Sequence, residues 1–407
     1  NQDTYFVSTI GSNVNDGTSS SDVWYSIEYA LSQVCDEDTI IVLDGTYYED
    51  SLEVDRDLVL GSMYLIDGDT NHISNTIIDG QDDGWIMMWY GGSNSWSDTT
   101  SNQVVGLTIR NGNSAGNGYA GGLTVYNNRV LKVKGVRFEY NQNNQDAGGA
   151  MYMRYNSYVE LQDVKMQFNH ANEGGAFYSY YCYSRFFDLD LNANTSNSER
   201  VAIYLNNARS FYSEDVTVRN HNSQNREIIS MNMWDLTSDA VLKNWIVRDN
   251  SAQARLFAIA QQGTDDKLTL ENCLIINNTT QNGGPGLLIR DTRNEVFILN
   301  STIADNRTIG STNKEGGAMI VMKSPQNDPS LTIVNSIVEN EYSTYTIAEN
   351  QDNGFDLNIE NSFIEGGSTK IEVSSNSTLS YGTSNLSLGL YFTDADNGDY
   401  RLSSVAT

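Results

Sequence analysis

A short pattern recurs along this sequence at nearly constant intervals. It consists of alternating apolar residues, one turn-forming residue, a second alternating run and then usually asparagine. The clearest copies are Leu131–Asn141, Val159–Asn169, Leu268–Asn278, Val296–Asn306 and Leu331–Asn340. Because a period of two places successive side chains on opposite faces of a strand, each copy predicts β-strand and excludes helical repeats.

The turn residue of each copy sets the period of the repeat. Successive turn residues are roughly 25 to 35 residues apart, which is the interval of a solenoid. Asn, Asp and Gly tolerate the left-handed backbone conformation that a sharp bend between two strands requires. Stacked asparagines can also form ladders of amide hydrogen bonds from coil to coil. The turn residues are Gly106, Gly135, Asp163, Asp188, Asp215, Asn244, Asn272, Asn300, Asn335 and Asn361.

These repeats predict an all-β chain wound into a right-handed parallel β-helix, in which coils stack about 4.8 Å apart. No linker of biased composition divides the sequence, so we expect residues 1–407 to form a single domain. Within it, residues 1–50 are expected to form an N-terminal cap and the first coil. Residues 51–366 would form the central coils and residues 367–407 the C-terminal coils.

A short helix is expected to cover the N-terminal end of the solenoid, because open strand edges promote aggregation. Asp22 can cap a helix that runs to about Val34, with Trp24, Ile27 and Leu31 on one face. The C-terminal end has no matching helix in the sequence. We therefore expect that end either to dock on a second copy of the chain, end to end, or to continue into further domains.

The charge of the chain restricts its partners. Lys and Arg number 24 against 52 Asp and Glu, which gives a net charge of −28. Nucleic acids and anionic membrane surfaces need clustered basic side chains, so both are excluded as partners. No stretch reaches the about 18 apolar residues of a membrane span. The sequence begins at Asn1 without a signal peptide, which favours a processed protein that is secreted or displayed at the cell surface.

The two ends of the sequence resemble those of secreted pectin-lyase-like β-helix proteins. At the start, the resemblance lies in Tyr5–Ser8, Gly11–Thr18, the helix that follows, and Ile40–Tyr47. Near the end, Gly398–Ser403 is similar to a closing element of many such proteins. The resemblance implies the fold but not one activity, because that superfamily includes lyases, hydrolases, adhesins and structural proteins.

The middle of the sequence resembles polymorphic outer membrane protein repeats, which pair a Phe-x-x-Asn element with a Gly-Gly-Ala element. Phe138–Asn141 precedes Gly148–Ala150, and Phe168 with Asn169 precedes Gly174–Ala176. Residues of about 185–270 lack the Gly-Gly-Ala element, so the likeness is partial there. These repeats imply surface display and adhesion more than catalysis.

The first candidate site follows the Gly-Gly elements. Tyrosine recurs in one phase of three successive strands, and polar or aromatic residues recur two positions later. If the other phase points inward, alternation turns both sets outward at intervals of about 5 Å, as a platform for sugar rings. We therefore predict a solvent-accessible glycan platform, with inward-pointing tyrosines as the alternative. Its residues are Tyr152, Tyr178, Tyr204, Arg154, Tyr180 and Asn206.

The second candidate site is an acidic loop near the end of the sequence. Asp394, Asp396 and Asp399 supply hard oxygen ligands around a glycine-containing turn, as Ca²⁺ prefers. No glutamate closes a twelve-residue EF-hand loop, and a plain solvated turn is the alternative. We predict structural calcium here and no other cofactor.

Residues for catalysis are harder to assign. The family resemblance implies a basic residue as the base of a lyase, with a cation against the uronate carboxylate. Residues of suitable type lie beside the coil-closing asparagines, namely Arg110, Arg219, Arg248, His170 and His221. A hydrolase would pair carboxylates about 5 to 10 Å apart, and stacked acids on successive coils meet that spacing by default. These acids are Asp163, Asp188 and Asp215.

Taken together, the sequence favours an extracellular, non-enzymatic β-helix. It would act as an adhesin, a glycan-binding protein or a structural subunit of a surface assembly. The alternative is a carbohydrate-active enzyme, a polysaccharide lyase or a glycoside hydrolase that acts on a long polysaccharide. Either function implies polysaccharide or glycoprotein glycans as partners.

Overall fold

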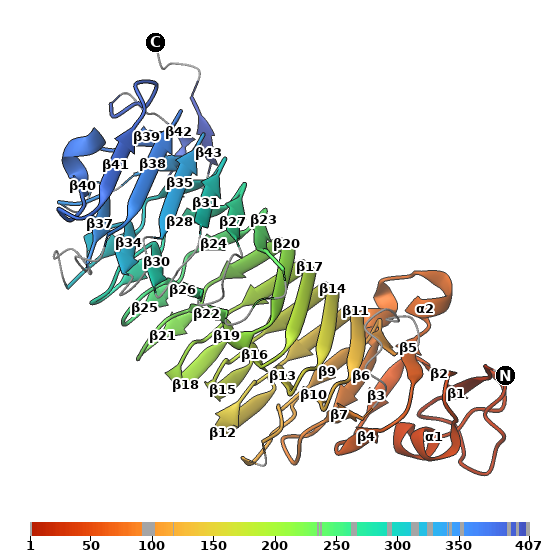
Figure 1. The fold of residues 1–407 in the computed structure, drawn as a ribbon. Coiled ribbons are helices and arrows are strands. Elements are labelled where there is room, and N and C mark those ends of the chain that lie inside the picture. Colours follow the sequence, from red (N-terminus) through yellow and green to blue (C-terminus); the bar gives the residue numbers. More distant parts are fainter. Residues whose placement is uncertain are drawn as a thin grey trace.

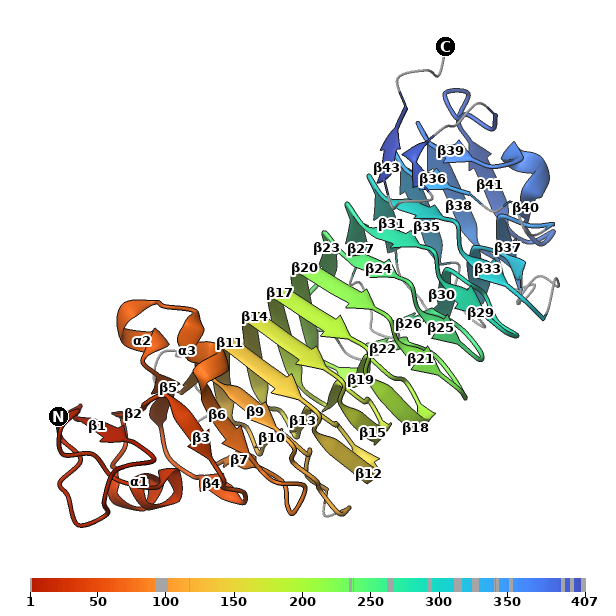
Figure 2. The same cartoon turned by 180° about the vertical axis from the view of Figure 1, so that it is seen from behind.

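The computed structural model is an elongated solenoid, in which strands from successive coils lie side by side along one axis (Figures 1 and 2). It describes residues 2–91, 102–116, 118–233, 236, 238–261, 267–290, 295–310, 317–323, 329–339, 341, 344–350, 354–388, 392–395 and 399–403. Three parallel sheets run along the axis, and each coil contributes to them in turn. The winding is that of the right-handed parallel β-helix predicted from the repeats.

Sheet A has 22 strands within the described residues, and every pairing in it is parallel. Its strands are β1 (Thr4–Val7), β2 (Asp38–Val42), β3 (Gly45–Tyr47), β5 (Leu58–Ser62), β6 (Thr76–Asp79), β8 (Gln103–Val105), β9 (Thr108–Arg110), β11 (Val130–Glu139), β14 (Tyr158–Gln167), β17 (Tyr183–Asn192), β20 (Ser210–Arg219), β23 (Ala240–Lys243), β24 (Ile246–Arg248), β27 (Leu268–Glu271), β28 (Leu274–Ile276), β31 (Glu295–Leu299), β32 (Thr302–Ala304), β35 (Ser330–Val334), β36 (Ile337–Val338), β38 (Asp356–Glu360), β39 (Phe363–Ile364) and β41 (Thr378–Tyr381).

In the coils from β12 to β33 the chain passes from sheet A to sheet C to sheet B and back to sheet A, whereas the described earlier and later coils have strands of sheets A and B only. Sheet C consists of β12 (Gln142–Ala147), β15 (His170–Glu173), β18 (Thr195–Glu199), β21 (Asn222–Ser223), β25 (Ser251–Ala252), β29 (Thr279–Thr280) and β33 (Arg307–Thr308). Sheet B consists of β4 (Leu52–Val54), β7 (Met87–Tyr90), β10 (Leu123–Tyr126), β13 (Met151–Arg154), β16 (Phe177–Tyr180), β19 (Ile203–Ala208), β22 (Ile229–Met233), β26 (Phe257–Gln261), β30 (Leu287–Arg290), β34 (Ile320–Lys323), β37 (Ile347–Glu349) and β40 (Ile371–Glu372).

The turn residues bend sheet A as the sequence predicted. All of them, from Gly106 with a φ of 71° to Asn361 with a φ of 48°, have left-handed backbone conformations. In β11, β14, β17 and β20 the bend leaves one continuous strand, whereas from Asn244 onward the two halves are separate strands. Three of these residues also form the predicted amide ladder, in which Asn272 donates to Asn244 over 2.7 Å and Asn244 to Asp215 over 2.9 Å.

A second, buried ladder lies where sheet A meets sheet C. The coil-closing asparagines point inward, and each side-chain oxygen accepts the backbone N–H of the equivalent residue one coil earlier. Asn169 Oδ1, for example, accepts from the backbone of Asn141 over 3.0 Å. The ladder satisfies backbone donors that apolar neighbours would leave buried without partners. Its asparagines are Asn141, Asn169, Asn194, Asn250, Asn278 and Asn306.

The apolar phase of each strand fills the interior with aligned side chains. Phe186 lies 5.0 Å from Phe177 and 5.3 Å from Phe211, measured between ring centroids, and all three are fully buried. These rings come from sheets A and B and from successive coils, and buried residues in register, such as Val133 and Leu161, repeat along the axis. This alignment gives each coil the hydrophobic contacts that it cannot form alone.

The N-terminal cover is present but shorter than predicted. Helix α1 (Ile27–Gln33) begins after Ser26, whose Oγ accepts from the Tyr29 backbone N–H. Asp22 is therefore not the cap, because Ser26 and the Glu49 carboxylate satisfy the first helical N–H groups. Two further short helices, α2 (Tyr64–Asp67) and α3 (Asn71–Asn75), interrupt the early coils. In the described residues, no helix is long and apolar enough to cross a membrane.

The C-terminal segment departs from the predicted coils. A 3₁₀ turn, η1 (Gly367–Lys370), and strands β40 and β41 continue the solenoid to Tyr381, but β42 (Phe392–Asp394) and β43 (Asp399–Leu402) form an antiparallel hairpin. The Tyr400 hydroxyl donates to Asp305 over 2.6 Å, so the hairpin folds back over an earlier corner.

Candidate functional site

The predicted platform tyrosines lie on the outer face of sheet B, on β13, β16 and β19. They belong to a small apolar cluster with Ala120 and Ala147, separate from the main core. Their rings pack edge to face, 4.9 Å apart between Tyr152 and Tyr178 and 4.8 Å between Tyr178 and Tyr204. The outward phase was therefore predicted correctly.

The prediction that these tyrosines are solvent-accessible was wrong. Tyr152, Tyr178 and Tyr204 are only 5%, 7% and 6% exposed. Burial is also the main cause that raises the pKa of each phenol, so the three hydroxyls stay protonated. Rings covered to this extent cannot stack on a sugar.

The chain itself covers these rings at the corner between sheets C and B. Gly148 and Gly174 have left-handed conformations and turn the chain sharply before each tyrosine. A Cβ atom on Gly148 would lie 2.8 Å from the Cβ of Tyr152, and one on Gly174 would lie 2.9 Å from that of Tyr178. Arg200 adds its guanidinium over the Tyr204 ring, 4.1 Å from the centroid. The Gly-Gly elements that located the tyrosines in the sequence also bury them.

The other three predicted residues follow these tyrosines by two residues in the sequence and lie on the same face of sheet B. Arg154, Tyr180 and Asn206 are in register on neighbouring strands and are half-buried rather than covered. Asn206 donates its side-chain amide to the Tyr178 hydroxyl over 3.1 Å. The structure thus brings the six predicted residues together as two rows. We call the buried Tyr152, Tyr178 and Tyr204 the lower row. The half-buried Arg154, Tyr180 and Asn206 are the upper row.

Two further tyrosines, which the sequence reasoning missed, extend the upper row around the corner between sheets B and A. Tyr155 and Tyr181 have φ values of 52° and 55°, and Tyr155 is 39% exposed. Asn127 and Asn207 occupy the same position on the flanking coils, with φ values of 57° and 58°. A signal was available in the sequence, because tyrosine replaces asparagine at a position that requires left-handed backbone.

We call Tyr126, Arg154, Tyr155, Tyr180 and Tyr181 the tyrosine–arginine corner. The Arg154 guanidinium lies 4.9 Å from the Tyr155 ring centroid and donates to the Tyr155 hydroxyl over 3.1 Å. Ring centroids are 5.5 Å apart between Tyr126 and Tyr155, 6.1 Å between Tyr155 and Tyr180, and 4.5 Å between Tyr180 and Tyr181. The corner therefore presents a continuous, rigid row of rings with polar tips, which suits a ligand with apolar faces and hydroxyl edges.

The basic residues proposed for a lyase form ion pairs with neighbouring acidic residues. Arg110 pairs with Asp79 over 2.8 Å, and Arg219 pairs with Asp190 over 2.8 Å. Arg248 pairs with the adjacent Asp249. These contacts neutralise the guanidinium groups and use their donors, so none of the three is arranged as a base for a bound substrate.

The two candidate histidines form hydrogen bonds to groups of the fold itself. His221 is fully buried in the asparagine ladder, where Nδ1 accepts from the Asn194 backbone over 3.0 Å and Nε2 donates to the Leu191 carbonyl over 3.1 Å. Burial lowers the pKa of His221 to about 4. His170 is half-buried, with Nδ1 2.8 Å from the Thr195 hydroxyl, and burial lowers its pKa as well.

The stacked acids at the bend of sheet A include one pair that is suited to acid–base chemistry. Asp163 and Asp188 lie on adjacent coils, while Asp215 accepts the Asn244 amide. Burial and then the charge of Asp188 raise the pKa of Asp163. Two neighbouring carboxyl groups of which one holds its proton more tightly can divide the roles of acid and base.

The proposed calcium loop coincides with the C-terminal hairpin. Asp394 ends β42, and Asp399 begins β43. Both carboxylate oxygens of Asp399 accept from Arg401, over 2.8 and 2.6 Å, and this pairing lowers the pKa of Asp399 to about 2. Asp396 lies outside the described residues. Arg401 therefore competes with a cation for Asp399, and calcium binding by this loop stays a prediction. The described residues contain no group of three His, Cys, Asp or Glu suited to a metal ion.

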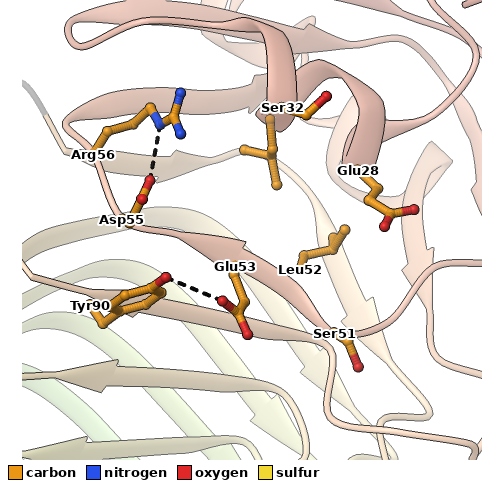
Figure 3. A pocket seen from close by; sticks show the side chains of 9 residues that line it. Glu28, Ser32, Ser51, Leu52, Glu53, Asp55, Arg56 and Tyr90 are labelled. Carbon is orange, nitrogen blue, oxygen red and sulfur yellow. Dashed lines mark hydrogen bonds and ion pairs between the residues drawn. The ribbon is translucent and has the colours of Figure 1, made fainter.

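A separate open cavity of about 330 Å³ lies between helix α1 and the first strands of sheet B. Figure 3 shows Glu28 from the helix facing Glu53 and Tyr90 across the cavity, with the Tyr90 hydroxyl 3.2 Å from the Glu53 carboxylate. Arg56 pairs with Asp55 over 3.0 Å at one side. Acidic groups outnumber the single arginine, so this cavity disfavours an anionic ligand.

Comparison with known proteins concerns the fold alone. No family model and no curated protein sequence matches the chain. The A-module of the mannuronan C-5 epimerase AlgE4 from Azotobacter vinelandii is similar over 89% of this chain and 93% of that chain, with 14% identity and a TM-score of 0.46. The GH136 lacto-N-biosidase from Eubacterium ramulus is similar over 93% and 68%, with 11% identity and a TM-score of 0.37. The pectate lyase Pel9A is similar over 100% and 90%, with 11% identity and a TM-score of 0.35.

The coil architecture is a right-handed parallel β-helix, the fold that the sequence resemblance to pectin-lyase-like proteins predicted. The solved structures similar to it include a polysaccharide lyase and a glycoside hydrolase. At these identities no residue role is carried over to this chain. The resemblance to polymorphic outer membrane protein repeats stays a prediction.

Proposed function

We propose that this β-helix is an extracellular carbohydrate-binding protein that holds a polysaccharide at the tyrosine–arginine corner. The observation that supports this function is the placement of Tyr155 and Tyr181 in left-handed backbone, partly open to solvent. Bulky residues in this conformation are strained by an amount on the order of 1 kcal/mol, whereas asparagine accepts it readily. Stability alone would therefore favour asparagine, as on the flanking coils.

The arrangement also matches the repeat of a polymer. Equivalent side chains recur about every 4.8 Å along the axis, so a glycan chain lying along the corner meets a ring on each of three successive coils. The rings are held by one another and by Arg154, so little side-chain entropy is lost when a ligand binds. Tyrosine hydroxyls and the guanidinium supply hydrogen-bond donors for sugar oxygens.

A screen of polysaccharides for both retention and release of unsaturated ends tests the proposal. We expect the protein to be retained by at least one glycan class without releasing such ends. The variant Tyr155→Asn should weaken retention at least about tenfold, a loss of about 1.4 kcal/mol. Tyr48 is an exposed tyrosine far from the corner, 64% exposed, so Tyr48→Ala serves as the matched control and should leave retention unchanged. Equal retention of wild type and Tyr155→Asn would overturn the assignment of the site.

A second function, hydrolysis of a glycosidic bond, is supported by the neighbouring Asp163 and Asp188. The raised pKa of Asp163 suits a proton donor, and the adjacent Asp188 carboxylate would act as base or nucleophile. In this case the wild type would generate new reducing ends from the retained glycan, and Asp163→Asn and Asp188→Asn would each abolish that release. Retention without new reducing ends excludes this function for the glycan tested.

The role as an adhesin or a subunit of a surface assembly belongs to the same proposal. It requires secretion or surface display, for which the acidic composition is suited. End-to-end association of copies is a further part of it, to be measured as a concentration-dependent mass by analytical ultracentrifugation.

A further inference from the structure

A second pair of aromatic rings lies at a different corner, where sheet A meets sheet C. Tyr140 and Phe168 both have a φ of 57°, and they are 53% and 44% exposed. Asn111, one coil before, and Asn220, two coils after, hold the same left-handed position. The chain thus places two large apolar side chains in strained backbone and leaves them in solvent. Neither the local backbone nor hydrophobic burial accounts for that choice.

The two rings are stacked along the solenoid axis. Their centroids are 5.2 Å apart and their planes differ by 13°, so each ring faces along the axis. One face of Phe168 therefore rests on Tyr140, and the other faces the next coil. Ala193 occupies the equivalent position there, with a φ of 51°. A methyl group cannot cover a phenyl ring, which agrees with the exposure of Phe168.

Residues that neighbour Phe168 and Ala193 in register carry uncharged polar groups. Asn192 Oδ1 accepts from the Asn220 amide over 2.9 Å, and the exposed Thr195 hydroxyl lies 2.8 Å from His170 Nδ1. Of the charged groups on the adjoining strands, Asp190 and Arg219 neutralise each other in a two-bond ion pair, and Glu139, beside Tyr140, accepts from the Gln167 amide over 2.8 Å. An aromatic face bordered by amide and hydroxyl groups suits a ring with an apolar face and hydroxyl edges.

We infer that Phe168 is a second binding site that takes one neutral hexopyranose ring of a glycan. Tyr140 supports one face of the Phe168 ring, and the small Ala193 leaves the other face uncovered. This second site goes beyond the proposed function, because the ten-residue strand β14 separates Phe168 from Tyr155. The sugar ring stacks its C–H face on Phe168, while its hydroxyl groups hydrogen-bond to Asn192, Asn220 and Thr195. A glycan that runs along one corner does not reach the other, so the two sites act independently.

The test uses the full chain and neutral hexasaccharides of glucose, mannose and galactose, with a hexasaccharide of uronic acid as the charged comparison. Affinity is measured by isothermal titration and stability by thermal unfolding. We expect Phe168→Asn to weaken binding of a neutral hexasaccharide at least about tenfold, equal to about 1.4 kcal/mol. Its unfolding temperature should equal or exceed that of the wild type, because asparagine tolerates this backbone.

A second variant keeps the aromatic ring and covers it. Ala193→Asn places a longer side chain over the free face of Phe168 in a conformation that asparagine accepts, so it should weaken binding as Phe168→Asn does. Tyr48→Ala serves as the control, because Tyr48 is exposed and belongs to neither corner, and it should leave the affinity for the neutral hexasaccharide unchanged. The inference is overturned if the wild type binds none of the neutral hexasaccharides at millimolar concentration or binds the uronic acid hexasaccharide equally well. It is also overturned if either corner variant keeps the wild-type affinity.

These outcomes separate the two proposals. Loss of glycan retention in Tyr155→Asn, with unchanged affinity in Phe168→Asn, would remove the second site and leave the proposed function intact. Loss in Phe168→Asn alone would support the second site and remove the assignment of the tyrosine–arginine corner.

Discussion

His221 takes a position that asparagine fills on most neighbouring coils, and this makes the buried ladder sensitive to acid. Its ring reproduces the two roles of asparagine, accepting through Nδ1 and donating through Nε2, but only while it is neutral. Its pKa is lowered from 6.5 to about 4 in the folded protein. Below about pH 6.5 the unfolded chain binds this proton first, so stability falls as the pH decreases toward 4.

We therefore expect His221→Asn to remove part of the acid sensitivity. At pH 5 the unfavourable contribution of His221 is on the order of 2 kcal/mol, and asparagine does not titrate. The unfolding temperature of the wild type should drop between pH 7 and pH 5 by more than that of His221→Asn. His72 is the control, because hydrogen bonding to Asp44 raises its pKa and gives the opposite dependence. A drop of equal size in wild type and His221→Asn would refute the explanation.

Glu339 gives the opposite pH dependence at the other end of the solenoid. Burial, and then the charges of Asp305 and Glu365, raise its pKa from 4.5 to about 7. The folded protein therefore holds a proton that the unfolded chain has lost, and the contribution to stability present below about pH 4.5 disappears as the pH rises through 7. Glu339→Gln should raise the unfolding temperature at pH 8 and change it little at pH 4. The exposed Glu360 is the control, and a gain of the same size in Glu360→Gln would contradict this account.

Single residues also show what the sequence could and could not determine. Alternation alone gave the correct phase of Tyr152, Tyr178 and Tyr204, because strand geometry fixes which face a residue occupies. Their exposure depends on how the preceding Gly-Gly turn folds over them, which the period of the pattern does not encode. The aromatic residues at the corners could have been found, since Tyr140 and Phe168 directly precede coil-closing asparagines.

At the scale of elements, glycines with the same backbone conformation have distinct tasks that substitution can separate, as the coil-corner Gly148 and the α2 cap Gly68 show. Gly148 and Gly68 have nearly equal φ values, 76° and 74°. A Cβ on Gly148 would lie 2.6 Å from the Met151 carbonyl oxygen, whereas one on Gly68 would meet nothing within 4 Å. Gly148→Ala should therefore lower the unfolding temperature clearly more than Gly68→Ala, in which only the backbone strain of about 1 kcal/mol acts.

The same variant tests why the platform tyrosines are buried. If the Gly148 turn covers Tyr152, displacing that turn in Gly148→Ala should make Tyr152 reactive toward nitration, as mapped by mass spectrometry. Tyr152 should remain protected in Gly68→Ala. Protection of Tyr152 in both variants would mean that neighbouring groups other than this turn cover the ring.

Elements were predictable where backbone conformation selects the residue type. The bend in sheet A was readable because only Gly, Asn and Asp fill it, from Gly106 to Asn361. Boundaries were less certain, since Ser26 rather than Asp22 caps helix α1. The hairpin after Tyr381 was missed because short alternating runs fit coil strands and hairpin strands equally well.

At the scale of the whole molecule, each coil is stabilised by its two neighbours, so damage to one coil should divide the solenoid. Asn250 lies in the middle of the buried ladder. Its amide donates to the Val218 carbonyl over 3.0 Å and to Asn278 Oδ1 over 2.9 Å, and its oxygen accepts from the His221 backbone over 2.9 Å. Asn250→Ala leaves these buried groups without partners, at about 1 to 3 kcal/mol each.

Asn250→Ala removes hydrogen bonds at one interface between coils. The coupling between the N-terminal and C-terminal coils therefore becomes weakest there. Calorimetry of Asn250→Ala should therefore resolve separate transitions for the N-terminal and C-terminal coils, and hydrogen exchange should become faster first around β24 and β25. Asn277, which precedes Asn278 on the next coil, is the matched control. It is exposed and lies on the outer side of the same corner. A uniform decrease in the unfolding temperature of Asn250→Ala, with one transition and evenly faster exchange, would mean that the core of aligned apolar side chains rather than the ladder transmits cooperativity along the axis.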